Sequence, residues 1–430
     1  ALEISPVRCR SLRLMNGSTV WNVASLADDI VKEKSVQALW TVIRPGYMVA
    51  VFLLGWAMNV SLFNRFRIDY AAVLNLSKEE LVSPRFLVAL ATLLALCLSL
   101  VRVMASWYGA SIELLAGVLA WYLLALLAVV GLLPRMVAKH SRWREPFSQA
   151  LWRCVWPETS KEIPFVEVLV ADGLTSLAKL FFDVSTGVCI VSSYQMQSSS
   201  LGSLENFTAL EAASLIHKRQ ESAGAELAAA LDVCSGSPVP YIAWSVPFLI
   251  RARQCIITAR HAPDALTRDL QRVNLAKYLS ALPVVFFAMC HARVVPGVAA
   301  SMLGPEDFEV LWALAAVVNS VFSFLWDLVM DWGLLHLTPN KPTTFGLRPQ
   351  LLYPVAPALY YLMILLNFIG RTLWSLRWSE HATIFLGSFF LSSCQQGAEV
   401  VRRCLWNLMR VEWQCIVKGK FPRPDKIFPV

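Results

Sequence analysis

The sequence is poor in charge. Only 16% of its 430 residues are Asp, Glu, Lys or Arg, whereas an ordinary soluble domain has about 25%. Hydrophobic residues make up 57% of the chain, which has 16 tryptophans and a mean hydropathy of +0.54. This composition excludes an ordinary soluble domain and predicts a polytopic membrane protein.

Signatures of metal sites and disulfides are also scarce. The ten cysteines include no CxxC pair, and the six histidines show neither an HExxH motif nor a paired spacing. We therefore expect no metal site, no cofactor and no disulfide framework. Six cysteines lie in or beside apolar runs, where thiols pack as small hydrophobes: Cys97, Cys189, Cys255, Cys290, Cys394 and Cys404.

The first 44 residues lack the continuous apolar core of a cleavable signal peptide. They are polar and mixed, and they predict a juxtamembrane amphipathic segment. The net charge of +8 comes from Lys and Arg residues that lie largely between the apolar runs. Membrane topology places basic residues in this way, so nucleic-acid binding is not expected.

Apolar segments recur along the chain with nearly the length of roughly 20 residues that a helix needs to cross a membrane. Two of them, 164–192 and 236–258, are interrupted by charged residues. The sequence predicts an all-α, polytopic transmembrane bundle of about nine spans. The other seven segments are 45–64, 86–101, 112–134, 278–292, 308–326, 351–370 and 381–398.

The loops between the spans predict an orientation. Loops after the third, fifth and ninth spans are richer in Lys and Arg than those after even-numbered spans, a bias that marks the cytoplasmic side. The N-terminus is then luminal or extracellular and the C-terminus cytoplasmic. Asn206, in an NFT sequon, becomes the glycosylation candidate, whereas Asn75 is cytoplasmic. Strong helix formers at 203–231 predict a luminal helix.

Charges inside the spans are the strongest functional signal. An ion at bilayer depth costs about 2.5–3.5 kcal/mol on insertion scales, so it persists where it faces a cavity or a partner. The string WDLVMDWG places Asp327 and Asp331 one helical turn apart. These residues predict a polar pathway; the alternative is an ion network that only fixes helix packing. A second polar face, at helical spacing, consists of Asp172, Ser176, Lys179 and Asp183.

Three arginines indicate that the pathway takes an anion. Glu399 lies one turn from Arg402 and Arg403, and Arg371 lies one turn from Trp374. The planar guanidinium group suits bidentate contact with phosphate or carboxylate oxygens. The alternative for the arginines is snorkelling to a membrane interface, and the alternative for the tryptophan is packing or lipid contact.

Further groups complete the predicted pathway. Lys277 and Tyr278 add an ammonium and a phenol at the predicted cytoplasmic mouth of the sixth span. The carboxylates of Asp172, Asp327 and Asp331 would hold the basic groups in position and moderate their field. An anion would then bind without being trapped.

These charged strings are also where the sequence resembles a known family, the EXS-domain phosphate exporters. The resemblance covers nearly the whole chain after residue 45, and WDLVMDWG followed by Tyr-Pro and by Glu-x-x-Arg-Arg-x-x-Trp-Asn is its most specific part. The matching strings are FRIDYAAVLNLSKEEL (66–81), ADGLTSL (171–177), VPFLIRARQC (246–255), NLAKY (274–278), SFLWDLVMDWGL (323–334), LRPQLLYP (347–354), NFIGRTLW (367–374) and EVVRRCLWNLMRVE (399–412).

The resemblance implies export of inorganic phosphate through a path between the last six spans, in an EXS transport domain at 164–415. A juxtamembrane segment at 1–44 and transmembrane helices at 45–163 would precede this domain, and a cytoplasmic tail at 416–430 would follow it. Trp374 would be the gate and Arg251 has a less defined role. The implied path consists of Asp172, Ser176, Arg251, Lys277, Tyr278, Asp327, Asp331, Arg371, Glu399, Arg402 and Arg403.

The resemblance is strongest to the short Golgi type of the family, which has no SPX domain and is thought to return luminal phosphate to the cytosol. Inorganic phosphate and membrane lipids are the expected partners, and a homodimer is possible. Export at the plasma membrane, a non-transporting receptor or retention factor for glycosylation enzymes, and an intramembrane enzyme with Asp327 or Asp331 as nucleophile are the alternatives. We expect no catalytic residue.

Overall fold

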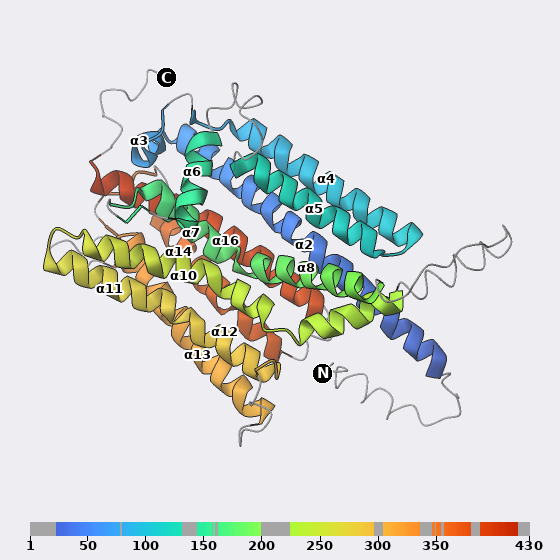
Figure 1. Ribbon diagram of the computed structural model, residues 1–430. Helices are drawn as coiled ribbons and strands as arrows, with labels where there is room; N and C mark the ends of the chain where they lie inside the picture. Colours follow the sequence, from blue (N-terminus) through green and yellow to red (C-terminus); the bar gives the residue numbers. More distant parts are fainter. Residues whose placement is uncertain are drawn as a thin grey trace.

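The structure is a computed structural model whose described part is built from helices, with no strand in it. The all-α prediction is confirmed for that part. Figure 1 shows the helices side by side in an elongated bundle. The described residues are 23–77, 80–130, 144–156, 158–159, 162–198, 224–295, 304–335, 346–348, 350–353, 357–379 and 388–419, so the glycosylation candidate Asn206 lies outside them.

Helix α2 (Val23–Arg65) runs without interruption through Pro45, where the sequence had suggested that a span begins. The helix starts earlier because side chains before the proline, among them Ala38, Val42 and Ile43, are buried against neighbouring helices. Gly55 lets α2 approach the last long helix closely, since a Cβ atom there would collide with the Cys404 thiol.

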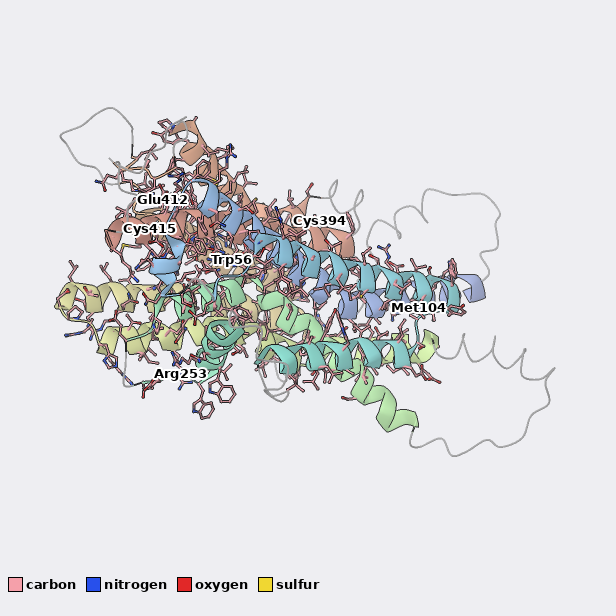
Figure 2. All side chains as sticks on the ribbon, turned by 90° about the horizontal axis from the view of Figure 1, so that it is seen from above. Trp56, Met104, Arg253, Cys394, Glu412 and Cys415 are labelled. Atoms are coloured by element: carbon pink, nitrogen blue, oxygen red, sulfur yellow. A yellow bond between two sulfur atoms is a disulfide. The ribbon has the colours of Figure 1, made fainter. Side chains whose placement is uncertain are left out.

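One layer of the bundle lies on the outer side of α2. It contains α4 (Pro84–Tyr108) and α5 (Ile112–Val130), both of which pack on α2 (Figure 1). Their outward faces are apolar, with Leu93, Leu96 and Leu100 about 60% exposed and Met104 exposed beside them (Figure 2). Such a face is typical of helices that contact lipid. Two short helices, α3 (Tyr70–Leu74) and α6 (Arg144–Val155), flank the bundle.

Two predicted spans are broken helices. Helices α7 (Phe165–Ser176) and α8 (Ala178–Ser198) meet at an angle of 60° at Leu177, and a helix at Gly224–Ser235 meets α10 (Val239–Arg260) at 54°. Gly236 and Pro238 account for the second break, because neither residue favours helix continuation.

The sixth predicted span is longer than expected. Helices α11 (Ala265–Leu279) and α12 (Ala281–His291) form one candidate span of 27 residues. Residues 265–277 had been read as a basic loop; they are helical instead. Asp264 caps the helix by accepting hydrogen bonds from the N–H and hydroxyl of Thr267, which lower the pKa of its carboxyl.

The last helices surround the centre of the bundle. Helix α13 (Pro305–Trp326) continues into a π-helical turn, η4 (Asp327–Asp331), and α14 (Pro357–Thr372) continues into the 3₁₀ turn η5 (Leu373–Trp378). Helix α16 (Ser388–Val417) contacts α2, α7, α14 and both of these turns. It runs through the middle of the molecule (Figure 1).

Five described helices are long and apolar enough to cross a membrane, and the two bent pairs raise the number to seven. Residues 112–127 of α5 form a shorter apolar helix. Helix α16 carries charged residues from Glu399 onward. The predicted number of nine spans stays a prediction. The polytopic membrane fold itself is clear.

Candidate functional site

A cluster of buried charged groups occupies the middle of the bundle. The eleven path residues expected from the sequence lie on α7, α10, α11, η4, α14 and α16, which meet there. They form three linked groups centred on Asp327, Asp172 and Asp331. We call these residues, together with Arg410, the central ion cluster.

Asp327 is the first centre. Its Oδ2 accepts hydrogen bonds from Arg371 Nε at 2.9 Å and Nη2 at 2.6 Å, and from Asn367 Nδ2 at 3.1 Å. Arg402 Nη1 lies 3.7 Å from the same oxygen, and Trp406 Nε1 donates to the other oxygen at 3.0 Å. The carboxylate, 1% exposed, is therefore held by groups from α14 and α16.

The π-helical turn explains why the two aspartates act separately. The N–H of Trp332 donates to the carbonyl of Asp327, five residues earlier, at 2.9 Å. A turn that contains an extra residue rotates Asp331 away from the position that regular α-helical spacing gives. The sequence had placed both carboxylates on one helical face, whereas Asp327 binds arginines and Asp331 faces Lys277 and Arg410.

The arginines of α16 differ in how they are neutralised. Arg402 binds Glu399 in a bidentate pair, with both N···O distances 2.7 Å. Arg403 donates instead to two hydroxyls, Ser176 Oγ at 2.7 Å and Thr175 Oγ1 at 3.2 Å. It makes no ion pair with any residue in the described part of the chain.

Both arginines are buried, at 4% and 6% exposure, which rules out the snorkelling alternative for them. Gly370 makes room for the Arg402 stem, because a Cβ atom there would lie 2.7 Å from Arg402 Cδ. The glycine of the NFIGRTLW string thus allows α14 to approach this side chain closely.

Asp172 is the second centre. Its Oδ1 accepts hydrogen bonds from Arg251 Nε and from the Tyr278 hydroxyl, both at 2.7 Å. The Arg251 guanidinium also lies over the Tyr278 ring, 4.7 Å from its centroid, and donates to the Gln254 side chain. Arg251, whose role was the least defined, is therefore a full member of the cluster.

Asp331 is the third centre, and its ion pairs are long. Lys277 Nζ lies 3.8 Å from one carboxylate oxygen and Arg410 Nε lies 3.6 Å from the other. The ammonium also faces the rings of Tyr278 and Trp326, at 4.3 and 5.3 Å. Lys277 and Tyr278 are thus buried in the bundle, midway along one candidate span, and not at a mouth as the sequence suggested.

The charges of the cluster do not balance. Six basic side chains, Arg251, Lys277, Arg371, Arg402, Arg403 and Arg410, face the four carboxylates of Asp172, Asp327, Asp331 and Glu399. An excess of two positive charges is left among these buried groups. Burying unmatched charge is costly, so such an arrangement favours an anionic ligand.

Trp374 lies in η5, beyond Arg371, and its indole is fixed on one side. Its Nε1 donates to Ser320 Oγ at 3.0 Å, and that hydroxyl donates to the carbonyl of Arg371 at 3.1 Å. The indole packs edge-on against Trp312 and Trp378, with ring centroids 5.5 and 5.7 Å away. It is half-buried and linked to the backbone of an arginine in the cluster.

The predicted polar stripe of the fourth span is divided by the bend at Leu177. Asp172 and Ser176 on α7 face the central ion cluster, as described. Asp183 on α8 instead binds Arg44 of α2, with N···O distances of 2.9 and 2.6 Å. The helical series that joined these residues is interrupted because the helix axis turns by 60° between them.

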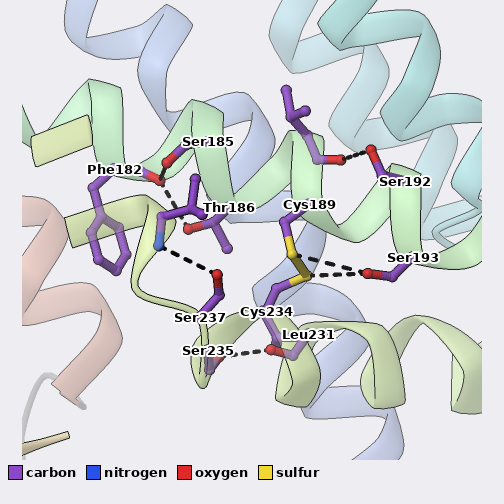
Figure 3. The surroundings of a disulfide bond; sticks show 12 residues. Phe182, Ser185, Thr186, Cys189, Ser192, Ser193, Leu231, Cys234, Ser235 and Ser237 are labelled. Atoms are coloured by element: carbon purple, nitrogen blue, oxygen red, sulfur yellow. Dashed lines mark hydrogen bonds between the residues drawn. A yellow bond between two sulfur atoms is a disulfide. The ribbon is translucent and has the colours of Figure 1, made fainter. Parts of the chain in front are cut away.

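The expectation of no disulfide was wrong. Cys189 of α8 and Cys234 of the Gly224–Ser235 helix are bonded, 45 residues apart in sequence (Figure 3). Ser193 lies beside both sulfurs, at 4.0 and 3.7 Å. The two cysteines enclose the segment that the charge pattern had made luminal, and this position was the signal that could have identified them.

Other contributors were also missed. Arg410 had been counted among the basic residues that follow the ninth span, although it follows Arg403 by seven residues and so shares its helical face. Trp406 and Gln254 bind Asp327 and Arg251, respectively, and both lie in strings that had been matched to the family. In the described ranges, no group of three His, Cys, Asp or Glu side chains could hold a metal ion.

Comparison with known proteins gives the same family over almost the whole chain. The family model described as "EXS family" matches residues 39–416. The human protein "Solute carrier family 53 member 1" is 24% identical over 404 residues, which are 91% of this chain and 53% of that protein. The chain spans about half the length of the curated relatives that it matches along most of its sequence.

Two other relatives have different names. The fission yeast (Schizosaccharomyces pombe) "Protein ERD1 homolog 1" is 29% identical over 178 residues, covering 39% of this chain and 42% of that protein. The Xenopus laevis "Xenotropic and polytropic retrovirus receptor 1 homolog" is 24% identical over 387 residues, covering 88% of this chain and 50% of that protein.

Proposed function

The chain belongs to the EXS family, and on that premise we propose that it moves inorganic phosphate across a membrane through the central ion cluster. It is an integral membrane protein. The observation that carries the proposal is the excess of two positive charges in this cluster, where Arg403 contacts two hydroxyls and the Trp406 ring but forms no ion pair with a described residue. An oxyanion that entered would replace the missing counter-charge.

The arrangement supports weak, repeated binding. Arg371, Arg402 and Arg403 supply guanidinium donors that replace the hydration of a phosphate ion, and the Ser176 and Tyr278 hydroxyls add hydrogen bonds. The four carboxylates keep most of the positive charge occupied. A phosphate ion is therefore attracted without being trapped, which conduction requires.

Trp374 is the proposed gate. Its hydrogen bond to Ser320 holds the indole beside the backbone of Arg371. Rotation of the indole away from Ser320 would break one neutral hydrogen bond and two edge-on ring contacts, each worth about 0.5–1.5 kcal/mol. A change of that size is compatible with rapid opening and closing. The contact of Trp374 with Trp312 and Trp378 would then open beside Arg371.

We propose that the protein returns luminal phosphate to the cytosol, with the Golgi as the favoured membrane and the plasma membrane as the alternative. Disulfides persist in oxidising compartments, so the Cys189–Cys234 bond supports a luminal or extracellular position for that end of the bundle. Glycosidase mapping tests the orientation. Glycan should be lost in Asn206→Gln. Glycan on Asn75 would contradict the proposed orientation.

Flux measurements test the transport proposal. Purified protein in phosphate-loaded vesicles should release phosphate, and Arg371→Ala and Arg403→Ala should reduce the initial rate at least about tenfold, since each removes a charged donor. Arg272→Ala is the matched control, because Arg272 is exposed and pairs with Asp269, which is exposed too. Wild-type vesicles that stay phosphate-tight would overturn the proposal.

The same experiment separates the alternatives. A non-transporting receptor or retention factor would leave vesicles tight, and the cluster would then serve only helix packing. An intramembrane enzyme is disfavoured because both suggested nucleophiles are already engaged: Asp327 accepts hydrogen bonds from Arg371, Asn367 and Trp406, and Asp331 forms ion pairs with Lys277 and Arg410. We assign no catalytic residue.

A further inference from the structure

A second polar cavity lies outside the central ion cluster. It has a volume of about 270 Å³ and is lined by residues of α2, α8, the Gly224–Ser235 helix and α16. Since one water takes up about 30 Å³ in the liquid, the cavity has room for a small ion with several waters. The lining residues used below are Arg44, Lys179, Asp183 and Ser392.

Two of the three charges in this cavity neutralise each other. Arg44 and Asp183 form a bidentate pair with N···O distances of 2.9 and 2.6 Å, and both residues are almost fully buried. Arg44 also approaches the Ser393 hydroxyl at 3.4 Å. The pair therefore contributes hydrogen-bonding groups to the cavity but no net charge.

Lys179 supplies the third charge, and no described carboxylate forms an ion pair with it. Its ammonium lies over the rings of Phe182 and Trp244, 3.4 and 5.5 Å from their centroids. Within the described part of the chain it makes neither an ion pair nor a hydrogen bond. Aromatic faces stabilise an ammonium only partly, by about 0.5–2 kcal/mol. The cavity is thus net positive and has polar walls.

We propose that this cavity is a second binding site for a small oxyanion of the phosphate class, with the Lys179 ammonium as its charged contact. The identity of the ligand, though not the existence of an anion site, rests on the proposed function. Ser392 precedes Glu399 by seven residues, about 10 Å along α16. The cavity would hold an anion before it enters, or after it leaves, the central ion cluster.

Binding of radiolabelled orthophosphate to the purified full chain tests the proposal. The protein would be held in a sugar detergent, which carries no phosphate of its own. Wild type should show two classes of site; Lys179→Gln should lose one of them or weaken it at least about tenfold. Lys179→Arg, which keeps the charge, should retain both. Arg403→Ala should lose the other class.

Binding by Lys179→Gln that equals wild type would overturn the second site, and so would equal losses in the Gln and Arg variants. If vesicles stay phosphate-tight but phosphate binding depends on Lys179, transport is overturned and this site stands. If vesicles release phosphate but binding does not depend on Lys179, transport stands and this site is overturned. A phosphoinositide added in micelles separates the possible sources. Displacement of orthophosphate from the Lys179 class would identify a lipid headgroup as the oxyanion.

Discussion

Two buried ionic regions lie along α16, and they are built differently. One is the central ion cluster, and the other lies around Arg348 and Glu412. Near the C-terminal end of the helix, Glu412 pairs with Arg348 and accepts hydrogen bonds from the Leu352 N–H and the Tyr360 hydroxyl, both at 2.6 Å. Arg348 also donates to the carbonyls of Trp332 and Gln350. We call these groups the Arg348–Glu412 network. Figure 2 shows Glu412 at one end of α16 and Cys394 at the other.

The comparison separates a structural role from a binding role. The Arg348–Glu412 network matches one cation with one anion, and backbone groups occupy much of the remaining hydrogen-bonding capacity. The central ion cluster has two more cations than carboxylates, and its Asp331 pairs are long. A matched network holds loops and helices together, whereas an unmatched one keeps capacity for a ligand.

The largest expected effect is on the matched network. Arg348→Met leaves the Glu412 carboxylate, 0% exposed, without a counter-ion. Breaking a buried pair from one side typically costs about 3–5 kcal/mol, so we expect a low yield of folded protein and a much lower melting temperature. Thermal unfolding in detergent measures this. Adding Glu412→Gln should recover part of the loss, and a stable single variant would contradict the structural role.

A middle-sized effect is expected when the central ion cluster is made more positive. Asp331→Asn removes one carboxylate whose ion pairs are 3.6–3.8 Å long, so folding should be little affected. The half-saturating phosphate concentration and the maximal flux should both fall, on the order of tenfold for one unit charge nearby. Concentration-dependent flux in vesicles measures both. Weaker phosphate binding in this variant would contradict an anion path.

The smallest effects come from a matched pair of hydroxyl deletions. Tyr360→Phe removes a hydrogen bond to Glu412 and should cost about 1 kcal/mol of stability, with flux unchanged. Ser176→Ala removes a hydrogen-bond partner of Arg403 and Glu399 and should lower flux up to about fivefold, with little change in stability. Melting curves and initial rates on both variants give the test. The opposite pattern would reverse the assigned roles.

The sequence was sufficient for the class and for every member of the central ion cluster except Arg410. Charges inside apolar segments are rare enough to be informative, and they drew attention to Asp327, Arg371 and Arg403 without any structural knowledge. The path role of these residues stays a prediction. Their partners were less accessible, because pairing depends on helices that are distant in sequence, as with Arg251 and Asp172.

Helical spacing failed where the helix was not regular. The bend at Leu177 separated Asp183 from Asp172, and the π-helical turn separated Asp331 from Asp327. The cap at Asp264 and the buried residues of α11 turned a predicted loop into part of a span. Neither the Arg44–Asp183 pair nor the Cys189–Cys234 bond leaves a local pattern, since each joins two separate helices.

The π-helical turn at Asp327–Asp331 sets the angle at which Asp331 leaves the helix axis. If the turn relaxed to a regular α-helix without losing a residue, each step from Asp327 would rotate the chain by about 100°, more than a π-helical turn does. Asp331 would then leave Lys277 and Arg410, although no charged residue had been removed. The backbone conformation at this point is therefore as constrained as the chemistry of its side chains.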